Sequence, residues 1–74
     1  MAVVLHLLKS ADPTLAQAII AQQIVAGDRV EVALLHGAPA PDLPAGVVVH
    51  RIPDDLAYSA LLEKIFQADQ VVTW

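Results

Sequence analysis

The side chains in this sequence that are best suited to acid–base catalysis or metal binding are its three histidines, His6, His36 and His50. No two of them have the close spacing that zinc ligands usually show, so the sequence predicts no metal site. The chain has no cysteine, which excludes disulfides, zinc–thiolate sites and a thiol nucleophile. His6 interrupts an apolar stretch, and we interpret it as a core or interface histidine satisfied by a hydrogen bond. The alternative is that His6 is a general base or a polar group at a subunit contact.

A second group of polar residues follows the first apolar segment. Lys9 and Ser10 come directly after residues 2–8, and ligands of open α/β sheets bind beyond the carboxyl ends of the strands. Lys9, Ser10 and His36 could therefore line one crevice. The sequence lacks a glycine-rich phosphate-binding loop, which favours a solvated Lys9 and a Ser10 that serves a turn. We predict no cofactor and no catalytic site, and ligand binding in this crevice is the alternative.

Four segments have the pattern of strands: residues 2–8, 29–35, 47–52 and 71–74. Residues 2–8 are apolar except for His6, as is typical of a strand buried on both faces of a parallel sheet. In residues 29–35, Val30, Val32 and Leu34 share one face, while Arg29, Glu31 and Ala33 share the other. Residues 36–46 hold three prolines and two glycines and therefore form a loop.

Two segments carry helix signals. Asp12 is a good N-cap before Pro13, and Gly27 ends the first helix. Asp54 and Asp55 are adjacent carboxylates whose position after Pro53 indicates helix capping rather than catalysis. They precede a helix over residues 56–67, whose apolar stripe consists of Tyr58, Leu61, Leu62, Ile65 and Phe66.

The order of elements is therefore β-α-β-β-α-β in one domain, residues 1–74. Helices between strands imply parallel crossovers, so we predict an α/β fold with a small, mostly parallel four-stranded sheet and helices on both faces. The strand order 3-2-1-4 keeps the most apolar strand inside the sheet.

The composition favours a chain that packs against other subunits. Hydrophobic residues make up 57% of the chain and the mean hydropathy is +0.60, yet a domain of this size buries only about 60% of its surface. The apolar stretches are too short for a transmembrane helix, and no basic region precedes the first one, so we expect a cytoplasmic protein. The net charge is −4 and the four Lys/Arg residues are dispersed, which argues against direct nucleic-acid binding. Trp74 is a candidate interface anchor.

The two ends of the chain resemble one protein family. The stretch Leu5-His6-Leu7-Leu8-Lys9-Ser10, which leads into a helix, is similar to the start of DsrH/TusB proteins. Val71-Val72-Thr73-Trp74 resembles the short strand ending in tryptophan in that family, and Ala26-Gly27-Asp28 before the second strand also fits.

The resemblance implies a DsrE/DsrF/DsrH-type fold and a role in sulfur relay. TusB-like chains join DsrE/TusD-like and DsrF/TusC-like subunits in a complex that passes persulfide sulfur toward 2-thiouridine in tRNA, and the related Dsr complex serves sulfur oxidation. The sulfur is carried chiefly on a cysteine of the DsrE/TusD-like partner, so a chain without cysteine would be a non-catalytic subunit. The proline-rich loop at residues 36–46 departs from the family, whose members commonly have a longer segment with helical content there. A homo-oligomer, including a small ligand- or nucleotide-binding module, is the alternative.

Overall fold

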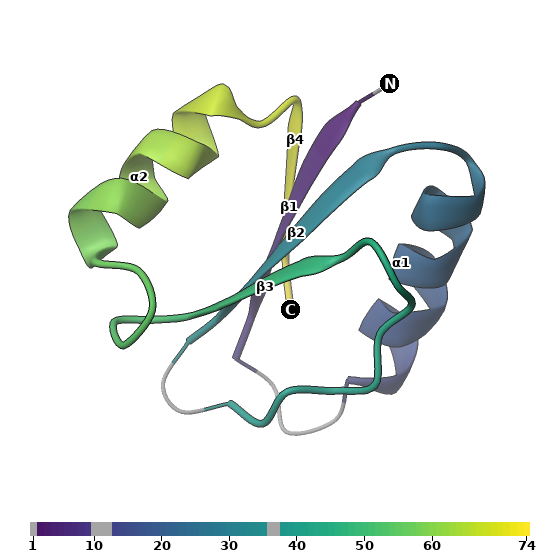
Figure 1. Cartoon of the computed structure of the whole chain (residues 1–74), viewed down its shortest axis with the longest axis horizontal. Helices are drawn as coiled ribbons and strands as arrows, with labels where there is room; N and C mark the ends of the chain where they lie inside the picture. Colours follow the sequence, from purple (N-terminus) through teal and green to yellow (C-terminus); the bar gives the residue numbers. More distant parts are fainter. Residues whose placement is uncertain (1, 10–12, 36–37) are drawn as a thin grey trace.

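The computed structural model describes residues 2–9, 13–35 and 38–74. Its elements are β1 (Val3–Leu8), α1 (Thr14–Val25), β2 (Arg29–Leu34), β3 (Val48–Arg51), α2 (Tyr58–Gln67) and β4 (Gln70–Thr73). The order β-α-β-β-α-β confirms the prediction, and boundaries differ from the expected ones by one or two residues (Figure 1).

The four strands form one sheet of order β3-β2-β1-β4, and every neighbouring pair is parallel. The apolar strand β1 lies inside, paired with β2 over its whole length, while β3 and β4 form the edges. This confirms the predicted order 3-2-1-4. Burial is the physical reason, because a strand without polar alternation has no face suited to water.

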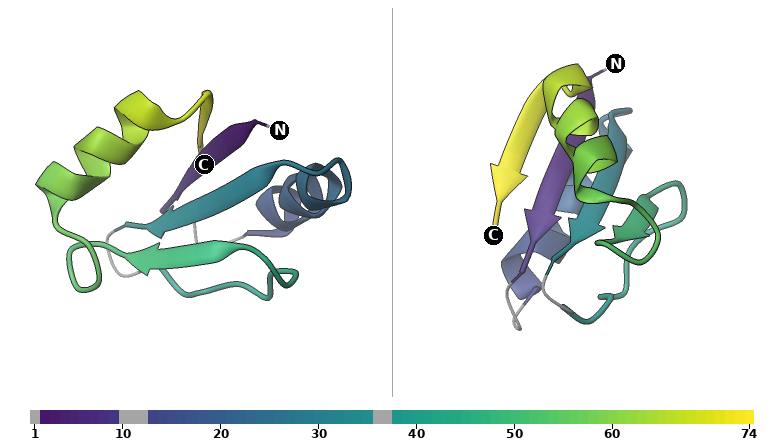
Figure 2. Two further views of the ribbon diagram at one scale, coloured as in Figure 1. Left: turned by 45° about the horizontal axis from the view of Figure 1, so that its top comes forward. Right: turned by 90° about the vertical axis from the view of Figure 1, so that its left-hand side faces the viewer.

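The two helices lie on opposite faces of the sheet (Figure 2). The α1-side core contains Leu8, Ala16, Ile20, Val30, Val32 and Leu34. The α2-side core contains Leu5, Ala33, Ile52 and Leu61. The two faces alternate along β2 as its sequence predicts.

The connection from β2 to β3 covers part of the α1 face. Leu43 and Val47 from this connection pack against the α1-side core, and the Gln17 side chain donates a hydrogen bond of 3.0 Å to the Asp42 carbonyl. The connection has no helix in its described part, residues 38–47, as its prolines predict. The chain thus covers each face with a helix and part of a connection, because Ile52 and Leu56, between β3 and α2, contribute to the α2-side core.

The end of α1 follows from Gly27. Its φ of +88° lies in the left-handed region, and its amide donates to the Ile24 carbonyl at 3.0 Å. The Asp28 amide donates to the Gln23 carbonyl at 3.0 Å, which completes a Schellman motif. Gly27 is therefore the predicted stop signal. At the other end, α1 begins at Thr14, directly after Pro13, and the predicted cap Asp12 lies outside the described residues.

The predicted cap of α2 is wrong. Asp55 closes a turn at the end of β3: its carboxylate accepts the Arg51 amide at 3.0 Å, and its own amide donates to the Arg51 carbonyl at 2.7 Å. Asp54 lies in the same turn. The helix begins at Tyr58 after an extended Ala57, with no side-chain cap. An Asp that finds backbone partners in a local turn does not serve the helix that follows.

Candidate functional site

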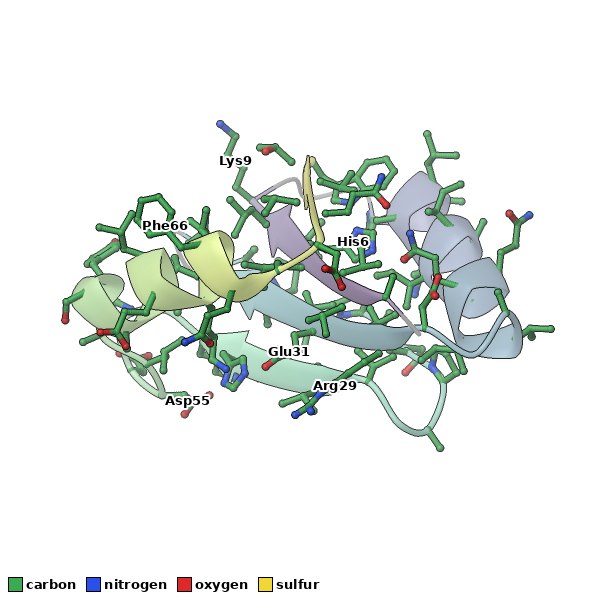
Figure 3. All side chains as sticks on the ribbon, turned by 90° about the horizontal axis from the view of Figure 1, so that it is seen from above. His6, Lys9, Arg29, Glu31, Asp55 and Phe66 are labelled. Carbon is green, nitrogen blue, oxygen red and sulfur yellow. The ribbon has the colours of Figure 1, made fainter. Side chains whose placement is uncertain are left out.

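The predicted crevice is only partly described. Lys9 is exposed just beyond the end of β1, whereas Ser10 and His36 lie outside the described residues. His6 lies in the middle of β1 and is completely buried on the face that α1 covers (Figure 3). Of these residues, then, only Lys9 is shown to be accessible to a ligand.

The His6 imidazole is held by hydrogen bonds at both nitrogens. Its Nδ1 accepts the indole N–H of Trp74 at 2.9 Å, so in the neutral ring the proton is on Nε2. The Nε2–H then donates to the Gln23 side-chain oxygen at 2.7 Å. Burial lowers the pKa of His6 and outweighs the opposing effect of the Gln23 hydrogen bond. A neutral, buried ring with both nitrogens engaged is a structural group and is not placed to act as a general base.

Trp74 is folded onto the chain's own core. Its ring lies nearly coplanar with that of His6, edge to edge, with centroids 6.1 Å apart and an interplanar angle of 14°, and its side chain packs against the α1-side core. The network Gln23–His6–Trp74 ties α1, β1 and the residue that follows β4 together. The chain itself therefore gives the indole an apolar surface and an acceptor, and the role of Trp74 as an interface anchor stays a prediction.

A second polar cluster lies on the α2 face of the sheet. The Glu31 carboxylate in β2 accepts hydrogen bonds from Lys64 of α2 at 2.9 Å and from His50 of β3 at 3.1 Å. Glu31 is buried, which raises its pKa, but Lys64 and His50 together outweigh burial and the net pKa is lowered. The carboxylate is thus an ion-pair acceptor that anchors α2 to the two strands.

Sequence reasoning missed this cluster, although one signal was available. Glu31 was placed correctly on the face opposite Val30 and Val32, and an acidic residue there must be paired if a helix covers it. A cavity of about 190 Å³ adjoins the cluster and is lined by Val3, Arg29, Glu31, Lys64, Gln67 and Ala68. Lys64 and Glu31 neutralise each other at its wall and support α2, and Arg29 is the remaining charged residue of the lining.

A second cavity lies at the carboxyl ends of β2 and β3. It has a volume of about 200 Å³ and is lined by Leu34, Ala38, Arg51, Ile52, Pro53, Asp54 and Tyr58. Ligands of open α/β sheets bind at this edge. The cavity is lined by the end of β3, whereas the predicted crevice was built around the end of β1.

The predicted apolar stripe of α2 divides into two. Leu61 is buried and Ile65 packs against the α2-side core. Tyr58, Leu62 and Phe66, spaced four residues apart, form a second row that is exposed at 57%, 54% and 80%. Phe66 lies on the side of α2 toward β4, opposite the side on which Glu31 is found (Figure 3).

Val71 in β4 adds to this exposed row. It pairs in register with Leu5, whose side chain is in the α2-side core, so Val71 faces the same side of the sheet and is partly exposed. We call Tyr58, Leu62, Phe66 and Val71 the α2–β4 apolar surface. Exposed apolar side chains of this size are candidates for a contact surface.

Residues 2–9, 13–35 and 38–74 offer neither a metal site nor a membrane-spanning helix. These residues contain no group of three His, Cys, Asp or Glu side chains placed to hold a metal ion. Neither helix within these ranges combines the length and apolar character that crossing a bilayer requires. Comparisons with models of protein families, with curated proteins and with solved structures found no match to this chain.

Proposed function

We propose that this chain is a non-catalytic subunit of a sulfur-relay complex. The observation that carries the proposal is the α2–β4 apolar surface, which leaves two aromatic side chains, Tyr58 and Phe66, exposed beside Leu62 and Val71. A subunit that docks on neighbours needs such a surface. The resemblance of the two terminal motifs to DsrH/TusB proteins is the reason for proposing a sulfur-relay complex in particular.

The chemistry of the chain supports a structural role within that complex. It has no cysteine to carry a persulfide, and its buried histidine is committed to Gln23 and Trp74. Sulfur would then travel on a cysteine of a DsrE/TusD-like partner, toward tRNA 2-thiouridine or in sulfur oxidation, with this chain as a supporting subunit. A cytoplasmic location and DsrF/TusC-like neighbours belong to the same proposal.

The test is co-purification from the native cell followed by deletion. A tagged chain should recover DsrE-like and DsrF-like subunits, and its deletion should reduce tRNA thiolation or sulfur oxidation. A Phe66→Glu variant should lose these partners if they dock on the α2–β4 apolar surface, whereas Leu15→Glu, which changes an exposed apolar residue on α1, is the matched control. Recovery of the chain without such partners, together with normal sulfur chemistry after deletion, contradicts the proposal.

One observation favours a second function, the binding of a small ligand. The cavity at the carboxyl ends of β2 and β3 places Arg51 and Tyr58 beside an apolar wall that includes Leu34 and Ile52. Asp54 in the same lining offsets the charge of Arg51, so the combination suits a small polar organic ligand or a nucleotide rather than a simple anion. Thermal-shift measurements against nucleotides and carboxylates test this function, with Arg51→Ala as the variant that should lose any stabilisation. The absence of a shift with every compound contradicts it.

A further inference from the structure

We propose that two copies of this chain pair through β4 in antiparallel orientation and join their α2–β4 apolar surfaces across a twofold axis. The proposal rests on the part of the proposed function that places the chain in an assembly, and it does not depend on sulfur transfer. It names one surface and one occupant, a second copy.

The two edges of the sheet differ in their protection. β3 carries Arg51, and prolines lie close to both of its ends, at Pro44 and Pro53. Charged side chains and prolines are the usual means by which an edge strand avoids pairing with another chain. β4, with the sequence QVVT, contains neither; Asp69 directly before it accepts a hydrogen bond from the Val3 amide at 2.8 Å, and no described element lies beyond β4 in the sheet (Figure 2).

The symmetry of antiparallel pairing brings like surfaces together. A twofold axis perpendicular to the sheet leaves α2 of both copies on the same face, one on each side of the new strand pair. Phe66 lies on the side of α2 toward β4 (Figure 3), whereas Tyr58, at the other end of the row, lines the cavity at the ends of β2 and β3. In the pair, the Phe66 side of one α2 therefore faces the Phe66 side of the other, with Val71 of both copies on the floor between them.

Charge permits this contact although each chain has a net charge of −4. The α2–β4 apolar surface contains no charged residue, and neither does β4. The charged residues of α2, Glu63 and Lys64, are outside this surface, and Lys64 is held by Glu31. The repulsion between the two acidic chains is therefore spread over the rest of the surface and is screened by salt.

The available area also fits a pair of copies. An aromatic side chain offers about 150–250 Å², so the exposed fractions of the four residues correspond to roughly 400 Å² of apolar surface per copy. A standard interface needs about 800 Å² per partner. The backbone and outward atoms of β4 supply part of the difference, because strand addition buries the whole edge.

The first experiment measures the size of the purified chain by sedimentation velocity from low to high micromolar concentration. We expect a dimer whose dissociation constant rises at least about tenfold in Phe66→Glu, since a central aromatic anchor is replaced by charges that face each other. Leu15→Glu, at a residue 63% exposed on α1, should leave the dimer intact. Because both residues are exposed, both variants should fold, which circular dichroism checks.

The second experiment reads the geometry directly. The chain has no cysteine, so single-cysteine variants at residues 70, 71, 72 and 73 each report one position. In antiparallel pairing about a twofold axis, one residue lies opposite its own copy with Cα atoms about 4.5–5.5 Å apart, close enough for a disulfide. Disulfide formation should therefore peak at one position in β4 and be weak for the control Val48→Cys in β3.

Several results overturn the proposal: a monomer at every concentration, a dimer insensitive to Phe66→Glu, equal disruption by Leu15→Glu, or cross-linking through β3. These results leave the sulfur-relay proposal standing if the chain recovers DsrE-like partners from cells. Conversely, a dimer that pairs through β4 but recovers no such partners contradicts the sulfur-relay proposal and supports the dimer proposal.

Discussion

Removing the Lys64 ammonium should destabilise the fold, because it leaves the buried Glu31 carboxylate with His50 as its remaining partner. The side chains of Lys64 and Glu31 are 28% and 11% exposed, so the pair is neither a surface ion pair nor a fully buried one. Exposed pairs contribute about 0–1 kcal/mol and breaking a buried pair costs about 3–5 kcal/mol. We therefore expect Lys64→Met, which retains most of the side-chain volume, to lower the free energy of unfolding by about 1–2 kcal/mol.

Urea denaturation at neutral pH measures this change. For a domain of this size each kcal/mol corresponds to a fall of about 4–8 °C in Tm. The matched comparison is a double-mutant cycle with Glu31→Gln. The double variant should be less destabilised than the sum of the single variants, because Gln leaves no buried charge behind.

The pH dependence gives an independent check on the same pair. The pKa of Glu31 is lowered in the folded chain, so the ionised carboxylate stabilises the fold at pH values above the unfolded pKa of about 4.5. This contribution is lost as the pH falls through the folded pKa. The difference in stability between the natural chain and Lys64→Met should therefore shrink in acid. A Lys64→Met variant within about 0.3 kcal/mol of the natural chain, or a cycle with no coupling, would refute the reasoning.

Three further predictions concern the α1 side of the molecule. Trp74→Phe removes the donor to His6 Nδ1 and should lower the free energy of unfolding by about 1–3 kcal/mol in urea denaturation followed by circular dichroism; no loss would mean that the hydrogen bond contributes nothing. Because the pKa of His6 is lowered, its ring should stay neutral to a lower pH in the folded chain than in the unfolded one, and NMR titration of the ring protons measures this. Stability should fall as the pH drops below the unfolded value of about 6.5, since only the unfolded chain then gains the proton; a His6 that titrates at or above that value contradicts the description. Gly27→Ala forces a side chain into a φ of +88° and should destabilise the chain by about 1 kcal/mol, whereas Ala26→Gly, one residue earlier with a helical φ of −73°, should have a smaller effect.

The sheet could be predicted from the sequence because burial in a parallel sheet leaves a clear signal. Residues 2–8 do not alternate between apolar and polar side chains, so both faces of this strand must be covered. A central position in the sheet provides that cover, and β1 accordingly lies between β2 and β4. Gly27 ended the first helix as expected, because the left-handed conformation of a helix stop favours glycine strongly. These are local or nearly local properties, and a single sequence carries them.

The candidate site depended on contacts between distant residues and was only partly predicted. His6 was identified as unusual, but its partners Gln23 and Trp74 are 17 and 68 positions away in the chain. Glu31 meets Lys64 only because α2 crosses the sheet at one particular place. Asp55 was predicted to cap the helix, but its carboxylate accepts a hydrogen bond from the Arg51 amide in a turn at the end of β3. Spacing alone does not determine which of several nearby backbone donors a carboxylate accepts.

Less of the sheet lacks cover than the sequence suggested, and assembly with other subunits stays a prediction. A shortage of cover was expected over the whole sheet, yet α1, the connection after β2 and Trp74 cover much of the α1 face, where Val49 of the edge strand β3 is 36% exposed. On the α2 face, α2 covers Leu5 and Ala33 but leaves Val71 and its own outer row exposed. One face can therefore be stable alone while the other meets a neighbour. A change such as Phe66→Glu should for this reason alter association without altering folding, and a change to Trp74 should do the reverse.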